Sequence, residues 1–131
     1  MTARNKTLVL DANILIRAVL GSRVRNLILN NADKVRFFVP EVCLADAKKY
    51  LPEILSGKGL DSSTAIDLLD YLRSRIQTLE NEWLEDFEES ARGRMQSRDL
   101  DDWPVLAAAL ALDCPIWTQD ADFFGVGVVT W

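Results

Sequence analysis

The sequence predicts an α/β protein with a mostly parallel sheet that is covered by helices on both faces. Short apolar runs of strand length alternate with longer segments whose apolar residues recur every three or four positions. Strands that alternate with helices in this way form parallel sheets. No internal repeat, low-complexity segment or linker rich in Pro, Gly and Ser interrupts the pattern. We therefore expect residues 1–131 to form a single domain.

Four segments have the composition of buried strands, since each is short, apolar and closed by a turn-forming or acidic residue. They are Thr7–Asp11, Val35–Val39 before Pro40, Pro115–Thr118, and Val126–Thr130. Open α/β sheets place their sites at the carboxyl ends of strands, beside a reversal in strand order. The two places to look for a site are therefore Asp11 and the segment Thr118-Gln119-Asp120.

The segments between these strands have helical periodicity. Predicted helices cover Ala12–Leu20 before Gly21, Arg23–Asn31, Glu41–Leu55 before Gly57 and Gly59, and the alanine-rich Leu100–Leu112. A short helix is expected after Thr118. The middle of the chain, from Leu60 to about Arg94, is also predicted to be helical, with a break whose position the pattern does not fix. Its apolar residues lie three and four apart, at Leu68, Leu69, Leu72, Ile76, Leu79 and Trp83, and Gly93 is its clearest stop.

The composition excludes several classes of function. The chain has 20 acidic and 15 basic residues, a net charge of −5 and no histidine, which excludes histidine-based catalytic triads and histidine-ligated zinc. Cys43 and Cys114 form no metal-spaced pair, no apolar run approaches the roughly 20 residues of a membrane span, and the polar start of the chain is unlike a signal peptide. We therefore expect a cytoplasmic, reduced protein. The negative net charge disfavours a protein that only binds nucleic acid, but it does not disfavour an enzyme that contacts phosphates through bound metal ions.

Acidic residues lie at or near the predicted strand ends, and they come from four different elements. They are Asp11; Asp46, with Glu41 as a competitor; Asp99, Asp101 and Asp102 before Pro104; and Asp120 and Asp122. Each has an ordinary structural explanation. Asp11 and Asp120 would be helix N-caps, Asp46 would pair with Lys49 or Arg36 or be exposed, and the acids before Pro104 would serve a helix N-terminus.

Taken together, these acids predict a metal site. Carboxylates gathered in one place repel one another unless a cation neutralises them. Hard oxygen ligands suit Mg²⁺ or Mn²⁺. Because no nucleophile–histidine pair is available, the chemistry that fits is metal-assisted hydrolysis of a phosphodiester.

Three segments carry a resemblance to a known family. They are Leu8–Ile16, which reads LVLDANILI; Val39–Asp46, which reads VPEVCLAD; and Arg98–Phe123, which contains DLDDWPVLAAA and PIWTQDADF. In this order they resemble the PIN-domain nucleases, close to the VapC-type toxins of bacterial toxin–antitoxin pairs. The resemblance spans nearly the whole chain. It implies a three-layer α/β/α PIN-like fold with four to five central strands, and Mg²⁺- or Mn²⁺-dependent endoribonuclease activity.

The resemblance also implies roles for particular residues. The catalytic and metal-binding acids would be Asp11, Asp46, Asp102 and Asp120. Asp99 and Asp122 would be accessory acids, while Asn13 and Thr118 would orient the carboxylates. Asp46 departs from the family, which has a glutamate there. Its side chain is shorter by one methylene and could need water to reach an ion, but we expect activity to survive because the other three acids match.

The same resemblance implies partners. A small antitoxin would cover the acidic pocket with its C-terminal segment, with an arginine that pairs with the carboxylates, and the protein would form a homodimer. Exposed cations would contact the phosphates of the RNA or would simply be solvated. The candidates are Arg17, Arg23, Arg25, Lys48 and Lys49, together with the run Arg92, Arg94 and Arg98.

Other functions fit the sequence less well. A PIN-fold module that binds RNA or a protein without cutting is the main alternative, and Asp46 is its support. A phosphatase with Asp11 as nucleophile is disfavoured, because haloacid-dehalogenase-type enzymes have a second acid where this chain has Asn13. A receiver domain would need a lysine after a late strand, where this chain has Gln119-Asp120, and no phosphate-binding P-loop motif occurs.

Overall fold

Among the residues that the structure describes, four parallel strands form the central sheet. The computed structural model describes residues 6–57, 59, 61–95 and 102–118. The strands are β1 (Lys6–Leu10), β2 (Val35–Pro40), β3 (Ile76–Leu79) and β4 (Ile116–Trp117). Their order across the sheet is β3-β2-β1-β4, and every pairing is parallel.

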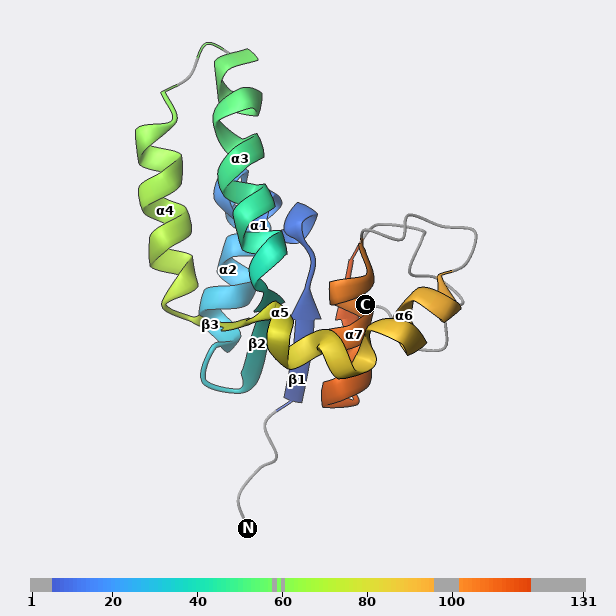
Figure 1. Ribbon diagram of the computed structural model, residues 1–131. Coiled ribbons are helices and arrows are strands. Elements are labelled where there is room, and N and C mark those ends of the chain that lie inside the picture. Colours follow the sequence, from blue (N-terminus) through green and yellow to red (C-terminus); the bar gives the residue numbers. More distant parts are fainter. Residues whose placement is uncertain (1–5, 58, 60, 96–101, 119–131) are drawn as a thin grey trace.

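The helices cover the sheet on both faces. The helices before β3 are α1 (Ala12–Leu20), α2 (Ser22–Asn31), α3 (Glu41–Gly57) and α4 (Ser63–Arg73). Those between β3 and β4 are α5 (Asn81–Leu84), a 3-10 turn (Glu85–Phe87), α6 (Glu88–Arg94) and α7 (Trp103–Leu112). The chain moves outward from β1 to β3 and then returns past β1 to β4, so right-handed crossovers send the two groups to opposite faces. Figure 1 shows α1 to α4 together on one side of the strands and α5 to α7 on the other.

This arrangement confirms the predicted α/β fold, with its three layers and parallel sheet. The predicted strand Val126–Thr130 and the short helix before it lie outside the described residues. Within the described ranges, none of the helices has both the length and the apolar character that crossing a membrane requires.

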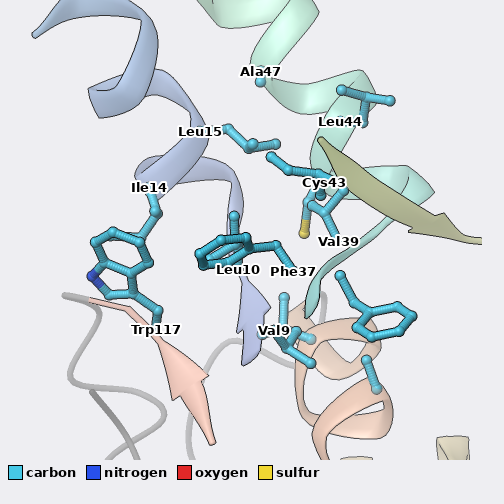
Figure 2. Packing of buried hydrophobic residues seen from close by; sticks show 14 of the residues in the cluster. Val9, Leu10, Ile14, Leu15, Phe37, Val39, Cys43, Leu44, Ala47 and Trp117 are labelled. Carbon is cyan, nitrogen blue, oxygen red and sulfur yellow. The ribbon is translucent and has the colours of Figure 1, made fainter. Parts of the chain in front are cut away.

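The core lies on both sides of β1. Leu8, Val9 and Leu10 are all buried, as expected for a strand covered on both faces. On one face, Ile14 and Leu15 of α1 pack around Leu10 (Figure 2). On the other face, α7 contacts β1 and β2, and every residue from Trp103 to Ala109 is buried. Its small alanine side chains allow the helix to approach the sheet closely.

Local sequence signals account for the predicted helices that were found. Asp11 caps α1 and Gly21 ends it, with the Gly21 N–H donating to the Arg17 carbonyl oxygen at 2.9 Å. The prediction Ala12–Leu20 is therefore confirmed to the residue. The helices α2, α3 and α7 and the strands β1, β2 and β4 differ from their predicted bounds only at the ends.

The prediction that the middle of the chain, from Leu60 to about Arg94, is helical was wrong at Ile76–Leu79, and the break that the sequence did not place lies there. The helix α4 ends at Arg73, where the Ser74 hydroxyl donates to the Tyr71 carbonyl oxygen at 2.6 Å. Ile76–Leu79 then forms β3 and pairs with β2. Ile76 and Leu79 matched the helical spacing by coincidence, because they lie in a short edge strand. Trp83, the next residue in that supposed stripe, is 49% exposed.

Candidate active site

Asp11 lies where β1 ends and α1 begins. Its Oδ1 accepts a hydrogen bond from the Ile14 N–H at 3.0 Å, so it caps α1 as a helix N-cap should. The residue is only 5% exposed, which is unusual for a carboxylate. Its second oxygen, Oδ2, accepts a hydrogen bond from the Thr118 hydroxyl, which is also buried. Capping of α1 therefore accounts for the hydrogen bond of Oδ1. The hydrogen bond of Oδ2 comes from Thr118, which directly follows β4.

The Asp11–Thr118 contact lies at the reversal in strand order. From β1 the chain goes to β2 on one side, whereas β4 pairs with β1 on the other side. This is the place at which open α/β sheets bind ligands. The structure thus joins the ends of the two strands that the sequence singled out.

The thiol of Cys43 shows which other acids are near. Burial raises the pKa of Cys43 well above its usual range, and the charges of Asp11, Asp46 and Asp102 raise it further. Each of these carboxylates must lie close to the sulfur for its charge to act on it. One comes from the end of β1, one from α3 and one from the start of α7. Three of the four predicted acids therefore lie near enough for their charges to act on one buried thiol. We call Asp11, Asp46 and Asp102 the acidic edge.

Sequence reasoning did not assign Cys43 to this place, because its position in the apolar stripe of α3 made it look like an ordinary core residue. Figure 2 shows its sulfur close to Val39, in the cluster that includes Leu15 and Leu44. The spacing to Asp46 was the available signal, since residues three apart on a helix share a face.

Asp102 occupies the N-cap position of α7 and is partly buried. Unlike Asp11, its side chain makes no capping hydrogen bond to the helix that it precedes. Pro104 lies in the first turn and has no N–H to offer. Capping of α7 therefore does not explain why an acidic residue occupies position 102.

Asp46 is partly buried on α3. It forms no ion pair with Lys49 or Arg36 within the part of the chain that the structure describes. The Lys49 ammonium instead lies over the Tyr50 ring at 5.3 Å, and the Arg36 guanidinium lies over the Phe38 ring at 5.4 Å. The salt-bridge explanation of Asp46 is therefore wrong.

Glu41, the alternative to Asp46 as a site residue, makes a hydrogen bond outside the acidic edge. It is exposed in the first turn of α3, and its Oε1 accepts a hydrogen bond from the Asn81 N–H at 3.0 Å. It is also absent from the charges that act on Cys43.

The remaining candidates are placed as follows. Asp99, Asp120, Asp122 and Arg98 lie outside the described residues. Asn13 is exposed in the first turn of α1, and Arg17, Arg23, Lys48 and Lys49 are exposed on the helices. Arg25 is partly buried and donates to the Val19 carbonyl oxygen at 3.4 Å. Arg92 pairs with Glu88 at 2.7 Å and lies over the Trp103 ring at 5.6 Å, so it ties α6 to α7.

In the described part of the chain, no group of three His, Cys, Asp or Glu side chains is placed so that it could hold a metal ion by itself. The acids of the acidic edge supply hard oxygen donors, which fit Mg²⁺ or Mn²⁺. Asp120 follows Thr118 by two residues and lies outside the described ranges.

The two thiols are expected to be unreactive in the folded protein at neutral pH. Burial, and then the charge of Asp113, raise the pKa of Cys114 to about 11. The thiolate is the reactive form, so alkylation of Cys114 by iodoacetamide should be slow at pH 8 and should increase roughly tenfold per pH unit up to that pKa. Asp113→Asn should speed the reaction at pH 8. Mass spectrometry of the folded protein checks this, and labelling of either thiol at the rate of the urea-unfolded chain would contradict it.

Comparison with known proteins identifies the family. The PIN domain matches residues 9–131 of the sequence. The chain belongs to the PIN-domain family. Among solved structures, a chain of VapBC2 from Rickettsia felis, bound to a DNA fragment from its promoter, is similar with a TM-score of 0.71. The two chains are 16% identical, and the match covers 95% of this chain and 97% of that one.

A chain of FitAB bound to the IR36 DNA fragment is also similar, with a TM-score of 0.56 and 15% identity over 95% of this PIN domain and 93% of that chain. At such identities the similarity concerns the fold alone. No curated protein matches the sequence.

Proposed function

We propose that this PIN domain is a divalent-metal-dependent endoribonuclease that hydrolyses RNA phosphodiester bonds as the toxin of a type II toxin–antitoxin pair. In this proposal residues 1–131 form a single nuclease domain. The observation that carries it is the contact of Asp11 with Thr118 at the reversal in strand order, with Asp46 and Asp102 near enough for their charges to act on the same buried thiol as that of Asp11. Like charges this close oppose one another, and a bound divalent cation relieves that repulsion.

The donor set fits Mg²⁺ or Mn²⁺ if Asp120 completes it. When bound, such an ion polarises the scissile phosphate and a water molecule. The protein's own contribution begins with Asp11. The Ile14 N–H fixes one of its oxygens and the Thr118 hydroxyl fixes the other, so the carboxylate is oriented before any ligand arrives.

Asp46 and Asp102 contribute from opposite faces of the sheet. One belongs to α3 and the other precedes α7, and these helices cover different faces. The site therefore draws on both outer layers and on the sheet between them. Asp99 and Asp122 would be accessory acids, and Asn13 would act from the first turn of α1.

The similarity to VapBC2 and FitAB supports a protein partner for this chain. We propose a small antitoxin whose C-terminal segment presents an arginine to Asp11, Asp46 and Asp102, because a guanidinium pairs with carboxylates in bidentate geometry. A homodimer would place two acidic edges along one RNA.

The test is cleavage of end-labelled structured RNA in Mn²⁺, in Mg²⁺ and in EDTA. We expect specific fragments with either ion and none in EDTA. Asp67→Asn, at an exposed acid in the middle of α4, is the matched control and should cut like the wild type. A folded protein that binds the RNA but cuts in neither ion would overturn the nuclease and favour the binding module.

Asp46 is the observation that favours that second candidate, and Asp46→Glu tests it. The longer side chain should reach the ion directly. We therefore expect the cleavage rate to rise severalfold and to reach half its maximum at a lower Mn²⁺ concentration. Asp67→Glu, at an exposed position on the helix α4, is the control for a general effect of glutamate. If Asp46→Glu slows cleavage, the site is built for the shorter acid.

A further inference from the structure

Four cations gather at the amino-terminal ends of three neighbouring strands. Lys6 begins β1, Lys34 directly precedes β2, Arg36 is the second residue of β2, and Arg75 directly precedes β3; all four are exposed. Lys6 pairs with Val35, and its N–H donates to the Lys34 carbonyl oxygen at 3.2 Å. We call these four residues the basic edge. Neighbouring strands lie about 5 Å apart, so the four residues lie along one edge of the sheet, with Lys6 and Arg36 on opposite faces of it.

The basic edge is positive in a chain of net charge −5. Across the described ranges, no ion pair involves any of the four cations. Two acids lie at the same end: Asp113 lines a cavity with Lys6, and Asp33 lines a smaller hollow with Arg75. The four cations outnumber these two acids.

Aromatic rings position two of the cations. The Arg36 guanidinium lies over the Phe38 ring at 5.4 Å, and the Arg75 guanidinium lies over the Tyr71 ring at 5.9 Å. A ring contact uses the face of the guanidinium and leaves its N–H groups for an anion. The helix ends of α2 and α4 lie beside Lys34 and Arg75 and attract cations. Lys6 and Arg36 belong to strands, so helix ends do not account for them.

We propose that the basic edge is a second RNA-contacting surface, which holds the phosphate backbone of the substrate away from the site of cleavage. This inference rests on the proposed ribonuclease function. The acidic edge repels phosphates except where an ion neutralises it, and backbone contacts come from lysine and arginine. The five residues of β1 separate the two edges by roughly 16 Å.

A cavity beside the basic edge favours RNA over an acidic peptide. It has a volume of about 680 Å³ and is lined by Lys6 together with apolar side chains that include Leu27, Val35, Phe37 and Leu112. Single-stranded nucleic acids are held by cations along the backbone and by apolar or aromatic walls beside the bases. The basic edge and this cavity supply both.

The test compares two sets of variants in an Asp102→Asn background, so that bound RNA is not cut. One set is Lys6→Gln, Lys34→Gln, Arg36→Gln and Arg75→Gln; the other is Arg17→Gln, Arg23→Gln, Lys48→Gln and Lys49→Gln. Both remove four exposed positive charges. We expect the basic-edge set to weaken binding of a labelled single-stranded RNA about tenfold or more, and to reduce the slope of log Kd against log salt by about 0.7 for each phosphate that is no longer neutralised. The other set should weaken binding less.

Equal reductions of affinity in both sets, a larger reduction in the second set, or no reduction would overturn the assignment. A lower melting temperature of the basic-edge set with unchanged RNA affinity would also overturn it, because the cations would then serve folding alone. Polyglutamate is the second probe. If the basic-edge set loses affinity for polyglutamate and keeps its affinity for RNA, the surface takes acidic peptides and the RNA assignment is wrong.

Cleavage by the wild type in Mn²⁺ and Mg²⁺ is measured in parallel and separates the two proposals. If the wild type cuts RNA and the basic-edge set binds RNA as tightly as the Asp102→Asn protein alone, this inference is overturned and the nuclease proposal stands. RNA binding that depends on the basic edge, without cleavage by the wild type, would support this inference and overturn the nuclease. Absence of both cleavage and binding would overturn both.

Discussion

Asp102→Asn is expected to abolish metal-dependent RNA cleavage while leaving the fold intact. The substitution removes one of the charges that gather around Cys43, and a neutral amide is a poor ligand for a hard cation. Removing one preorganised electrostatic interaction with a reacting phosphate lowers the rate by roughly 100-fold or more. The Asp102 side chain makes no capping hydrogen bond to α7, so the substitution removes no cap and the helix should keep its start. Initial cleavage rates and a thermal melt of the same preparation measure the two effects.

The matched control for this variant is Asp113→Asn, at the other end of α7. Asp113 has left-handed backbone geometry with φ of 50°, which asparagine tolerates, and it is exposed. It should melt at the same temperature and cut at the wild-type rate when RNA is saturating, so that a change of affinity at the basic edge does not enter the comparison. If Asp102→Asn retained more than half of the wild-type rate, Asp102 would be an ordinary helix-start residue and the site would need another acid.

Asp11→Ala is expected to cost both stability and activity. It removes the cap of α1, which contributes about 1 kcal/mol. It also takes the Asp11 acceptor away from the buried Thr118 hydroxyl, which costs about 1–3 kcal/mol. Relief of repulsion from Asp46 and Asp102 offsets part of this cost. We expect a net loss of about 2–3 kcal/mol and a fall in Tm of roughly 10 °C.

The comparison with Asp11→Asn separates the two roles of this residue. Asparagine still caps α1 through its amide oxygen, and its amide NH₂ can donate to the Thr118 hydroxyl oxygen instead of accepting from it, so its melting temperature should stay within a few degrees of the wild type. Its cleavage should nevertheless be abolished, because the charge is gone. Circular dichroism melts and the RNA assay decide the point. An alanine variant that melts like the wild type would show that neither hydrogen bond of Asp11 matters to the fold.

The parts of the fold that could be predicted are those specified by local signals. Asp11 and Gly21 mark both ends of α1, and the continuous apolar run of β1 identifies a strand buried on both faces. The strand β3 could not be predicted because pairing with β2 determines it. Its Ile76 and Leu79 are three residues apart, and that spacing alone does not distinguish an edge strand from a helix.

The site was predictable to the extent that topology constrains it. A parallel sheet puts the ends of β1 and β4 on one edge, so Asp11 and Thr118 could be expected to meet. Helical spacing does not tell whether Asp46 faces the solvent or the sheet. Its place beside Cys43 depends on how α3 packs, which is a tertiary property. Asp120 and Asp122 remain predictions from the resemblance.

The hydrogen bond from Thr118 to Asp11 joins residues that are 107 positions apart in the chain. At ribosomal speeds of about 5–20 residues per second, Thr118 emerges roughly 5 to 20 seconds after Asp11. Until then, one oxygen of the Asp11 carboxylate lacks the group that orients it, and β4 is not yet there to complete the reversal in strand order. A nascent chain therefore carries the first acid of the proposed nuclease without a finished site. For an enzyme that would cut RNA in the cell that makes it, this topology delays activity until translation of the domain is nearly complete, which spares the translating ribosome.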